Sequence, residues 1–277
     1  MTRLAYLGPP GTFSEEAALR YLPGADLLPC VTERAAVASV ERGEADEAVL
    51  PIENTLEGSV TRTVDILVHD TTLSIRAELV LPIEMCLISK QGADLHHVAV
   101  VYSKPEALSQ VRQYIERRFP SARQDASLST AAAVEEMLDA DNAVAIGPAR
   151  AAELYGAQIV ERGIQDHVHN QTRFVAVAQG DHVRTGADKT SIAFAVTHDQ
   201  PGSLVDVLHE FSDRAINLTK IESRPSREEL GIYIFLVDLE GHRAEPTVAE
   251  ALASVEAKAT FFRLLGSYPR GDHARDT

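Results

Sequence analysis

The sequence predicts an α/β protein that has two lobes and a small C-terminal domain of order βαββαβ. Three observations lead to this prediction. Short apolar runs alternate with helical patterns up to about residue 165. The apolar run 174–178 then returns as a late strand, so the chain crosses between the lobes. After the polar linker 180–189 the pattern changes. Strands that alternate with helices are typical of βαβ units and of mostly parallel sheets.

In the first lobe, about 1–80, we expect strands at 4–8 and 47–52 and helices at 13–22 and 60–69. In the second lobe, about 81–165, we expect strands at 84–89, 97–103 and 143–147 and helices at 105–119, 130–140 and 149–155. The segment 166–180 returns to the first lobe, so residues 1–180 are predicted to form one two-lobed domain.

Residues 188–270 are predicted to form the second domain. Its expected strands are 190–198, 217–225, 231–241 and 260–268, and its expected helices are 202–214 and 247–259. This order gives a small sheet with two helices on one face. We expect the polar tail 269–277 to be disordered.

The composition limits the function. The chain has 277 residues, with 41 acidic against 26 basic side chains and a net charge of -15. This charge argues against nucleic acid as a partner and means that an anionic ligand needs a local positive site. Cys30 and Cys86 have no metal or redox spacing and are interpreted as core thiols. Without a signal peptide or a membrane-length apolar run, the cytoplasm is the expected location.

Polar residues gather where predicted strands end. Thr12 with Glu15, and Ser103 with Glu106, have the spacing of a capping box, and Gly58–Ser59 is expected to begin a third helix. In open α/β sheets these turns lie where ligands bind, and helix N-termini suit anions. Each of these capping boxes and turns, taken alone, is more often a structural feature than a ligand-binding site.

The stretch "HNQTRFVAV" (169–177) runs from polar groups into an apolar strand. Arg173 offers a planar fork for a carboxylate, and Thr172 offers a hydroxyl that both donates and accepts. The alternative is a surface arginine beside a capping threonine, and these residues alone favour that alternative.

Several motifs together carry a resemblance that covers nearly the whole chain. With "YLGPPGTFS", "PIENTLEGSV", "VYSKPEAL" and "IQDHVHNQTRF", the chain resembles the prephenate dehydratases. "PGSLVDVLHEF" followed by "NLTKIESRP" is similar to the ACT regulatory domain of that family. The resemblance implies a two-lobed, periplasmic-binding-protein-like catalytic domain with a cleft, and a ferredoxin-like ACT domain. It also implies conversion of prephenate to phenylpyruvate, with loss of water and carbon dioxide, in L-phenylalanine biosynthesis and without a cofactor.

The resemblance also implies the site. The catalytic residues would be Asn54, Ser103, Gln110, Thr172 and Arg173, with Thr172 as hydrogen-bond donor to the leaving hydroxyl. The substrate-binding residues would be Gly11, Thr12, Phe13, Ser14, Thr55, Gly58, Ser59, Asn170 and Phe174. Glu53, Glu57 and Asp166 flank the site and are expected to cap or to face solvent. Thr55, Lys104 and Ser203 depart from the family, which often has serine, histidine and alanine there.

For regulation, the resemblance implies that ACT sheets pair side by side in a dimer, often a tetramer, with L-phenylalanine at the seam. The seam would be lined by Gly202, Ser203, Leu204, Asn217 and Leu218 and coupled to catalysis by Glu222, Ser223, Arg224 and Pro225. A non-catalytic amino-acid sensor is the alternative function, because two lobes and an ACT-like tail also suit a regulator. The Thr-Arg-Phe motif argues for the enzyme.

Overall fold

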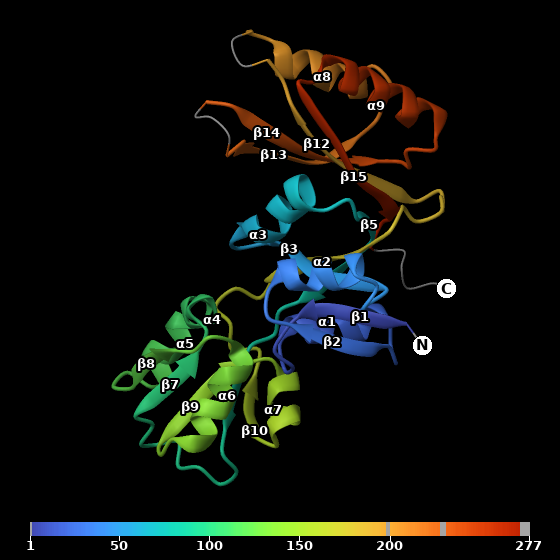
Figure 1. Cartoon of the computed structure of the whole chain (residues 1–277). Coiled ribbons are helices and arrows are strands. Elements are labelled where there is room, and N and C mark those ends of the chain that lie inside the picture. The colour runs from blue at the N-terminus through green and yellow to red at the C-terminus, as the bar shows by residue number, and fades with distance from the viewer. Residues whose placement is uncertain (1, 198–199, 228–230, 272–277) are drawn as a thin grey trace. The chain divides into compact units, whose positions relative to one another are not determined.

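The computed structural model describes residues 2–197, 200–227 and 231–271, so the expected disorder of the tail at 272–277 lies outside the described residues. Figure 1 labels most of the elements. Those of the N-terminal part are β1 (Arg3–Leu7), α1 (Phe13–Tyr21), β2 (Asp26–Cys30), α2 (Glu33–Glu41), β3 (Glu47–Asn54), β4 (Gly58–Ser59), α3 (Thr61–Asp65), η1 (Ile66–Asp70) and β5 (Ser74–Pro82).

The chain then forms β6 (Cys86–Ser89), β7 (Val100–Ser103), α4 (Pro105–Gln110), α5 (Arg112–Arg118), β8 (Arg123–Ala126), α6 (Thr130–Asp139), β9 (Ala143–Gly147), α7 (Ala149–Tyr155), β10 (Gln158–Arg162) and β11 (Gln171–Ala178). The C-terminal elements are β12 (Asp188–Ala195), α8 (Ser203–Ser212), β13 (Leu218–Pro225), β14 (Tyr233–Glu240), α9 (Pro246–Lys258) and β15 (Phe261–Pro269).

The first sheet has the strand order β2-β1-β3-β11-β5, with the short β4 antiparallel to β3. Strand β1 is parallel to both β2 and β3. Its centre, Leu4–Tyr6, is at most 1% exposed, as expected for a strand covered on both faces. Because β11 follows the second sheet in sequence and joins the first, the predicted crossover between lobes is confirmed.

The second sheet has the order β10-β6-β9-β7-β8. Strand β9 is buried along its whole length. The pairs β7–β8 and β7–β9 are parallel, whereas β6 is antiparallel to both β9 and β10. The expectation of a mostly parallel sheet is therefore wrong for this lobe, because half of its strand pairs are antiparallel.

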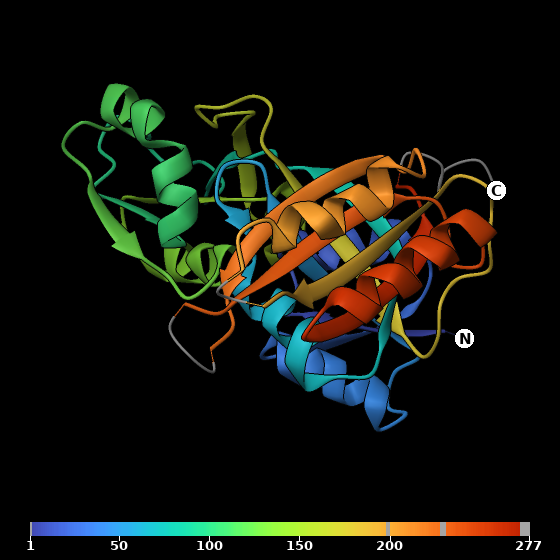
Figure 2. The same cartoon turned by 90° about the horizontal axis from the view of Figure 1, so that it is seen from above.

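The C-terminal sheet has the order β13-β14-β12-β15, and all its pairs are antiparallel. Helices α8 and α9 lie side by side on one face of it (Figures 1 and 2). Phe194 and Phe211 are at most 1% exposed in the core between sheet and helices, and Phe194 stacks on Phe235 with ring centroids 5.5 Å apart. The predicted βαββαβ layout is confirmed.

By its internal contacts the chain forms two compact units. One contains the chain up to Val60 together with Val80–Phe174. The other contains Thr61–Leu79 and the chain from Val175 onward, so α3, η1 and most of β5 belong with the C-terminal sheet. The domain boundaries 1–180 and 188–270 stay predictions.

Several predicted elements need correction. The helix expected over 105–119 is divided into α4 and α5 at Val111, whose backbone (φ -125°, ψ 21°) is not helical. The helix expected over 60–69 is α3 followed by the π-helical turn η1, and Gly58–Ser59 forms β4 and does not begin a helix. Pro269, the first residue of the expected tail, is the last residue of β15.

The sequence analysis also missed α2 and the strands β2, β5, β8 and β10. These four strands are all at the edges of their sheets. Strands β2, β8 and β10 have no buried residue, so their apolar pattern is weak; β5 has buried residues, and this reason does not apply to it.

Candidate functional site

In the turn before α1, the backbone N–H groups of Gly11 and Glu15 already have hydrogen-bond partners within the protein. Thr12 is the N-cap, and its Oγ1 accepts a hydrogen bond from the Glu15 N–H (3.4 Å). The Glu15 carboxylate, in a residue that is only 6% exposed, accepts from the Gly11 N–H (2.8 Å) and from Arg150 Nε on α7 (3.0 Å). A capping box is thus formed, except that the Glu15 carboxylate accepts from the Gly11 N–H and not from the N–H of the N-cap residue Thr12.

This turn is also a packing contact between the lobes. A Cβ on Gly11 would lie 3.3 Å from both the Ala131 Cβ of α6 and the Ala151 Cα of α7, and Gly11 has a φ of +82°. Ser14 is buried and Phe13 half-buried. Gly11, Thr12, Phe13 and Ser14 were expected to bind substrate, but the Gly11 N–H already has a carboxylate partner.

Asn54, at the end of β3, has a side-chain orientation that its neighbours determine. Its Oδ1 accepts hydrogen bonds from the N–H groups of Leu56 (2.8 Å) and Glu57 (3.2 Å). A backbone N–H only donates, so the carbonyl oxygen of the amide must face these two groups. The Asn54 Nδ2 therefore points the other way and donates to Asn170 Oδ1 (2.9 Å) and Thr172 Oγ1 (2.9 Å).

The chain of amides continues into the second lobe. Asn170, which is 2% exposed, donates from Nδ2 to Oε1 of Gln110 at the end of α4 (2.8 Å). The Gln110 Nε2 donates in turn to Glu57 Oε1 (2.8 Å). The network thus returns to the loop between β3 and β4, and its Asn54–Asn170 bond joins residues that are 116 positions apart in sequence.

The Thr172 hydroxyl accepts a hydrogen bond from Asn54. Its oxygen lies 2.9 Å from Asn54 Nδ2, which is the donor. A hydroxyl has one proton and can donate it while its oxygen accepts. Thr172 is half-buried near the beginning of β11, and its hydroxyl proton can be donated to a group other than Asn54.

Arg173 is the next residue of the same strand and has a different partner. Its Nη1 lies 3.5 Å from Glu53 Oε2, and its side chain is only 12% exposed. Charge-assisted hydrogen bonds are usually about 2.7–2.9 Å long, so this ion pair is loose. Thr172 and Arg173 both lie inside β11, where consecutive side chains point to opposite faces.

Several other expected site residues lie apart from this network. Ser103 is completely buried and donates to the Ile146 carbonyl (2.6 Å), so it does not cap a helix; Lys104 is the N-cap of α4 and uses no side-chain bond. Phe174 is 1% exposed and belongs to the core. Thr55 Oγ1 accepts from the Gln171 N–H (3.0 Å) and so joins the β3–β4 loop to β11.

The expected flanking carboxylates have partners of their own. Glu53 pairs with Arg173, Glu57 accepts from Gln110, and Asp166 Oδ2 accepts from the Gln113 N–H (3.0 Å). Each of these carboxylates therefore has a hydrogen-bond or ion-pair partner within the protein. The sequence analysis named Glu57 but not its bond to Gln110, because no sequence pattern joins residues 53 positions apart.

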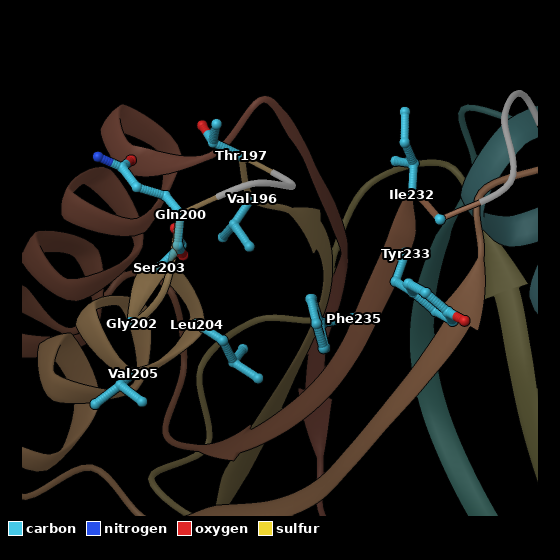
Figure 3. Close-up of a pocket in the computed structure, with 11 residues that line it drawn as sticks. Val196, Thr197, Gln200, Gly202, Ser203, Leu204, Val205, Ile232, Tyr233 and Phe235 are labelled. Carbon is cyan, nitrogen blue, oxygen red and sulfur yellow. The ribbon is translucent and has the colours of Figure 1, made fainter.

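A pocket of about 220 Å³ lies in the C-terminal unit, and Gly202, Ser203 and Leu204, which were predicted to line the effector seam, are among its lining residues (Figure 3). Val196, Leu204 and Phe235 point toward the same space and give it apolar walls. Gly202 caps α8 with a left-handed backbone, and Ser203 is the first helical residue. Asn217 and Leu218 do not line this pocket; the Leu218 side chain packs on the domain core.

The segment Glu222–Pro225 lies at the end of β13 and contacts α3 through arginine. Arg224 Nη2 is 3.3 Å from Asp65 Oδ1, and Arg227 also pairs with Asp65. Asp65 is 7% exposed, so both cations meet a nearly buried carboxylate. Ser223 and Pro225 are exposed.

Two further observations concern the described residues as a group. No cluster of three or more His, Cys, Asp or Glu side chains among residues 2–197, 200–227 and 231–271 is placed to hold a metal ion. No helix in these ranges combines the length and apolar character that a membrane crossing requires.

Burial raises the pKa of Cys86 to about 11 and also raises the pKa of Cys30, so both are protonated at neutral pH.

Comparisons with known proteins agree with this architecture. The family model for prephenate dehydratase matches residues 4–182, and the model for the ACT domain matches residues 190–257. The bifunctional chorismate mutase/prephenate dehydratase of Aquifex aeolicus is 42% identical over 97% of this chain and 74% of its own length. The prephenate dehydratase of Mycobacterium tuberculosis H37Rv is 39% identical over 99% of this chain and 89% of its own length.

Solved structures are similar over the same extent. The prephenate dehydratase of Arthrobacter aurescens, crystallised in complex with L-Phe, has a TM-score of 0.89 at 35% identity and covers 98% of this chain and 91% of its own. GqqA, described as a novel type of quorum quenching acylase, has a TM-score of 0.86 at 30% identity and covers 96% of this chain and 97% of its own.

Proposed function

Because the chain belongs to the prephenate dehydratase family, we propose that it removes water and carbon dioxide from prephenate to give phenylpyruvate, in the biosynthesis of L-phenylalanine. The observation that supports this most is the Thr172 hydroxyl, whose oxygen is held by Asn54 at 2.9 Å. Its proton is thereby directed away from Asn54, as a donor to a leaving group requires.

The substrate itself supplies the driving force of the reaction, so the main catalytic group that the protein must provide is this hydrogen-bond donor. Prephenate has a non-aromatic ring with a hydroxyl group and two carboxylates. When the C–O bond breaks, its electron pair leaves with the hydroxyl; the bond to the departing carboxylate supplies the electrons that make the ring aromatic. Thr172 donates to the developing hydroxide, which is stabilisation of the transition state and not of the substrate. A threonine hydroxyl does not titrate near neutrality, so it acts as a positioned donor.

Arg173 is proposed to bind a substrate carboxylate. The net charge of -15 makes a local cation necessary, and Arg173, which the family resemblance identifies, has the planar guanidinium that binds a carboxylate with two parallel hydrogen bonds. The α1 N-terminus is a weaker candidate because Glu15 occupies the Gly11 N–H. Lys104 lies 3.4 Å from Glu106 and is half-exposed, so its charge is available near α4 only in part.

The remaining assignments follow the same geometry. We place catalysis in a domain of residues 1–180 and regulation in residues 188–270. Asn54 and Gln110 belong to the site through the amide network. Ser103 acts at a distance, because its hydroxyl holds β7 to the Ile146 carbonyl of β9.

L-phenylalanine is proposed as the inhibitor that binds the pocket at the start of α8. The N–H groups of a helix N-terminus suit the carboxylate of an amino acid, and at α8 the Ser203 N–H also donates to the Gln200 carbonyl (3.2 Å). Val196, Leu204 and Phe235 offer the apolar surface that its ring needs. The pocket, at about 220 Å³, is smaller than the roughly 300–1,000 Å³ typical of drug-sized ligands, which favours a small molecule.

Two copies are proposed to pair through their ACT sheets, in the cytoplasm, as a homodimer or as part of a homotetramer. Strands β13 and β15 are the edges of the C-terminal sheet, and Ile221 on β13 is 49% exposed. Edge strands with exposed apolar side chains are usually covered by a partner. Sedimentation of the purified protein tests this part.

Incubation of the purified protein with prephenate tests the function. Phenylpyruvate absorbance should rise with saturable kinetics, and carbon dioxide should be released in equal amount. A non-catalytic sensor would bind prephenate without turnover, and hydrolysis of an acylated substrate with no action on prephenate would favour an acylase.

A further inference from the structure

We propose that Asn170 and Glu57 are positioning residues, which fix the orientation of the Gln110 amide relative to Asn54 and Thr172. This inference rests on the proposed function, because it concerns the same reaction. It replaces the expectation that Asn170 binds substrate.

The polarity of the network is determined link by link. The backbone N–H groups of Leu56 and Glu57 fix the Asn54 carbonyl oxygen, so the Asn54 Nδ2 must donate to Asn170 Oδ1. The Asn170 Nδ2 then donates to Gln110 Oε1, and the Gln110 Nε2 donates to Glu57. An ionised carboxylate only accepts, so Glu57 is the correct end for this chain of donors.

Asn170 occupies the central position in this chain. It lies just before β11, where the chain returns from the second lobe, and its amide bonds to Asn54 of the first lobe and to Gln110 of the second. At 2% exposure its side chain has no surface to offer a substrate. A buried polar network is costly when only partly satisfied, so each amide depends on its neighbours.

We call the hydrogen-bonded chain of Asn54, Asn170, Gln110 and Glu57 the relay. Reversing the donor–acceptor direction of its bonds tests the proposal. In Asn170→Asp, an ionised carboxylate offers only acceptors, so Gln110 must turn its Nε2 toward residue 170. The Gln110 carbonyl oxygen then faces the Glu57 carboxylate, which is repulsive. Adding Glu57→Gln supplies a donor at that end and returns the net charge of the relay to its original value.

We expect Asn170→Asp to lower kcat at least about tenfold and Glu57→Gln to have less than about a threefold effect, since glutamine still offers an acceptor. The double variant should recover most of the loss. When the introduced aspartate is protonated, it carries an O–H donor in place of the native amide N–H. The kcat of Asn170→Asp relative to wild type should therefore rise as the pH is lowered, and the double variant should show no such rise.

If Asn170→Asp does not fold, the exposed end of the relay still gives a test. Glu57→Leu removes the acceptor and should lower kcat, whereas Glu57→Gln keeps it. Equal kcat for the Glu57→Leu and Glu57→Gln variants, or a double variant no better than the product of the two single effects, would overturn the relay.

A double-mutant cycle on thermal unfolding separates this proposal from the proposed function. Positive coupling between positions 57 and 170 in the melting temperature is expected whether or not the protein acts on prephenate. If the wild-type protein does not turn over prephenate but positions 57 and 170 are coupled, only the proposed function is contradicted. If the wild-type protein is active but shows neither this coupling nor recovery of kcat in the double variant, only the relay is contradicted.

Discussion

Replacing Gly266 by alanine should strongly destabilise the C-terminal unit. Gly266 lies on β15 with φ +148°, and a Cβ built there would be 2.3 Å from the Ile75 carbonyl oxygen and 2.7 Å from the Ile75 nitrogen of β5. Both atoms are backbone, so no side chain can rotate to relieve the contact. Either β15 or β5 must shift by about 1 Å to reach ordinary contact distance.

The expected magnitude has two parts. Overpacking of this kind costs about 1–3 kcal/mol, and a non-glycine residue at an unfavourable φ costs about 1–3 kcal/mol more. Gly186 provides the matched control, because it has φ +93° in the same unit but nothing within 4 Å of its built Cβ. Gly186→Ala therefore reports backbone strain alone, and Gly266→Ala should lose about 1–3 kcal/mol beyond it.

Urea unfolding followed by circular dichroism measures this difference. The transition that reports the C-terminal unit should have a much lower midpoint in Gly266→Ala than in Gly186→Ala. Equal midpoints for the two alanine variants would refute the close approach of β15 and β5.

Three further predictions follow from other contacts. Arg173→Lys keeps the charge but loses the planar fork, and steady-state kinetics should show KM raised about 10- to 100-fold with a smaller change in kcat. Asp65→Asn should weaken phenylalanine inhibition and leave uninhibited turnover intact, because it breaks the buried pair with Arg224; Arg227→Gln, which removes only the more exposed partner, should do less. The pKa of Cys86 rises with burial from 9.0 to about 11, so wild-type unfolding free energy should fall between pH 9 and 11, and fall less in Cys86→Ala; equal slopes would contradict this.

The architecture was predictable because its signals are local. Buried strands such as β9 are continuous apolar runs, and the switch to βαββαβ after the linker is visible in the order of the elements. The edge strands and the break of the helix at Val111 were not visible, since partly exposed strands have weak patterns and a single non-helical residue leaves no compositional sign.

The site was predictable only in part. The family resemblance named Asn54, Gln110 and Thr172, which the amide network joins. It did not show that Asn170 is buried between these residues, or that Ser103 bonds to a carbonyl of the neighbouring strand. Such contacts depend on how distant segments fold together, and the residue types alone do not determine them.

The donor role of Thr172 is tested most directly by prephenate turnover in two variants. Thr172→Ser keeps the hydroxyl, and Thr172→Val keeps the shape without it; the Gln171 carbonyl, 3.2 Å from Asn54 Nδ2, remains as an acceptor in both, so stability should change by only about 0.5–1.5 kcal/mol. Single-turnover kinetics should show serine within about tenfold of wild type and valine slower by about 10²–10³, equivalent to about 2.7–4 kcal/mol, with prephenate binding preserved. A folded Thr172→Val protein that turns over prephenate at the wild-type rate would contradict the account.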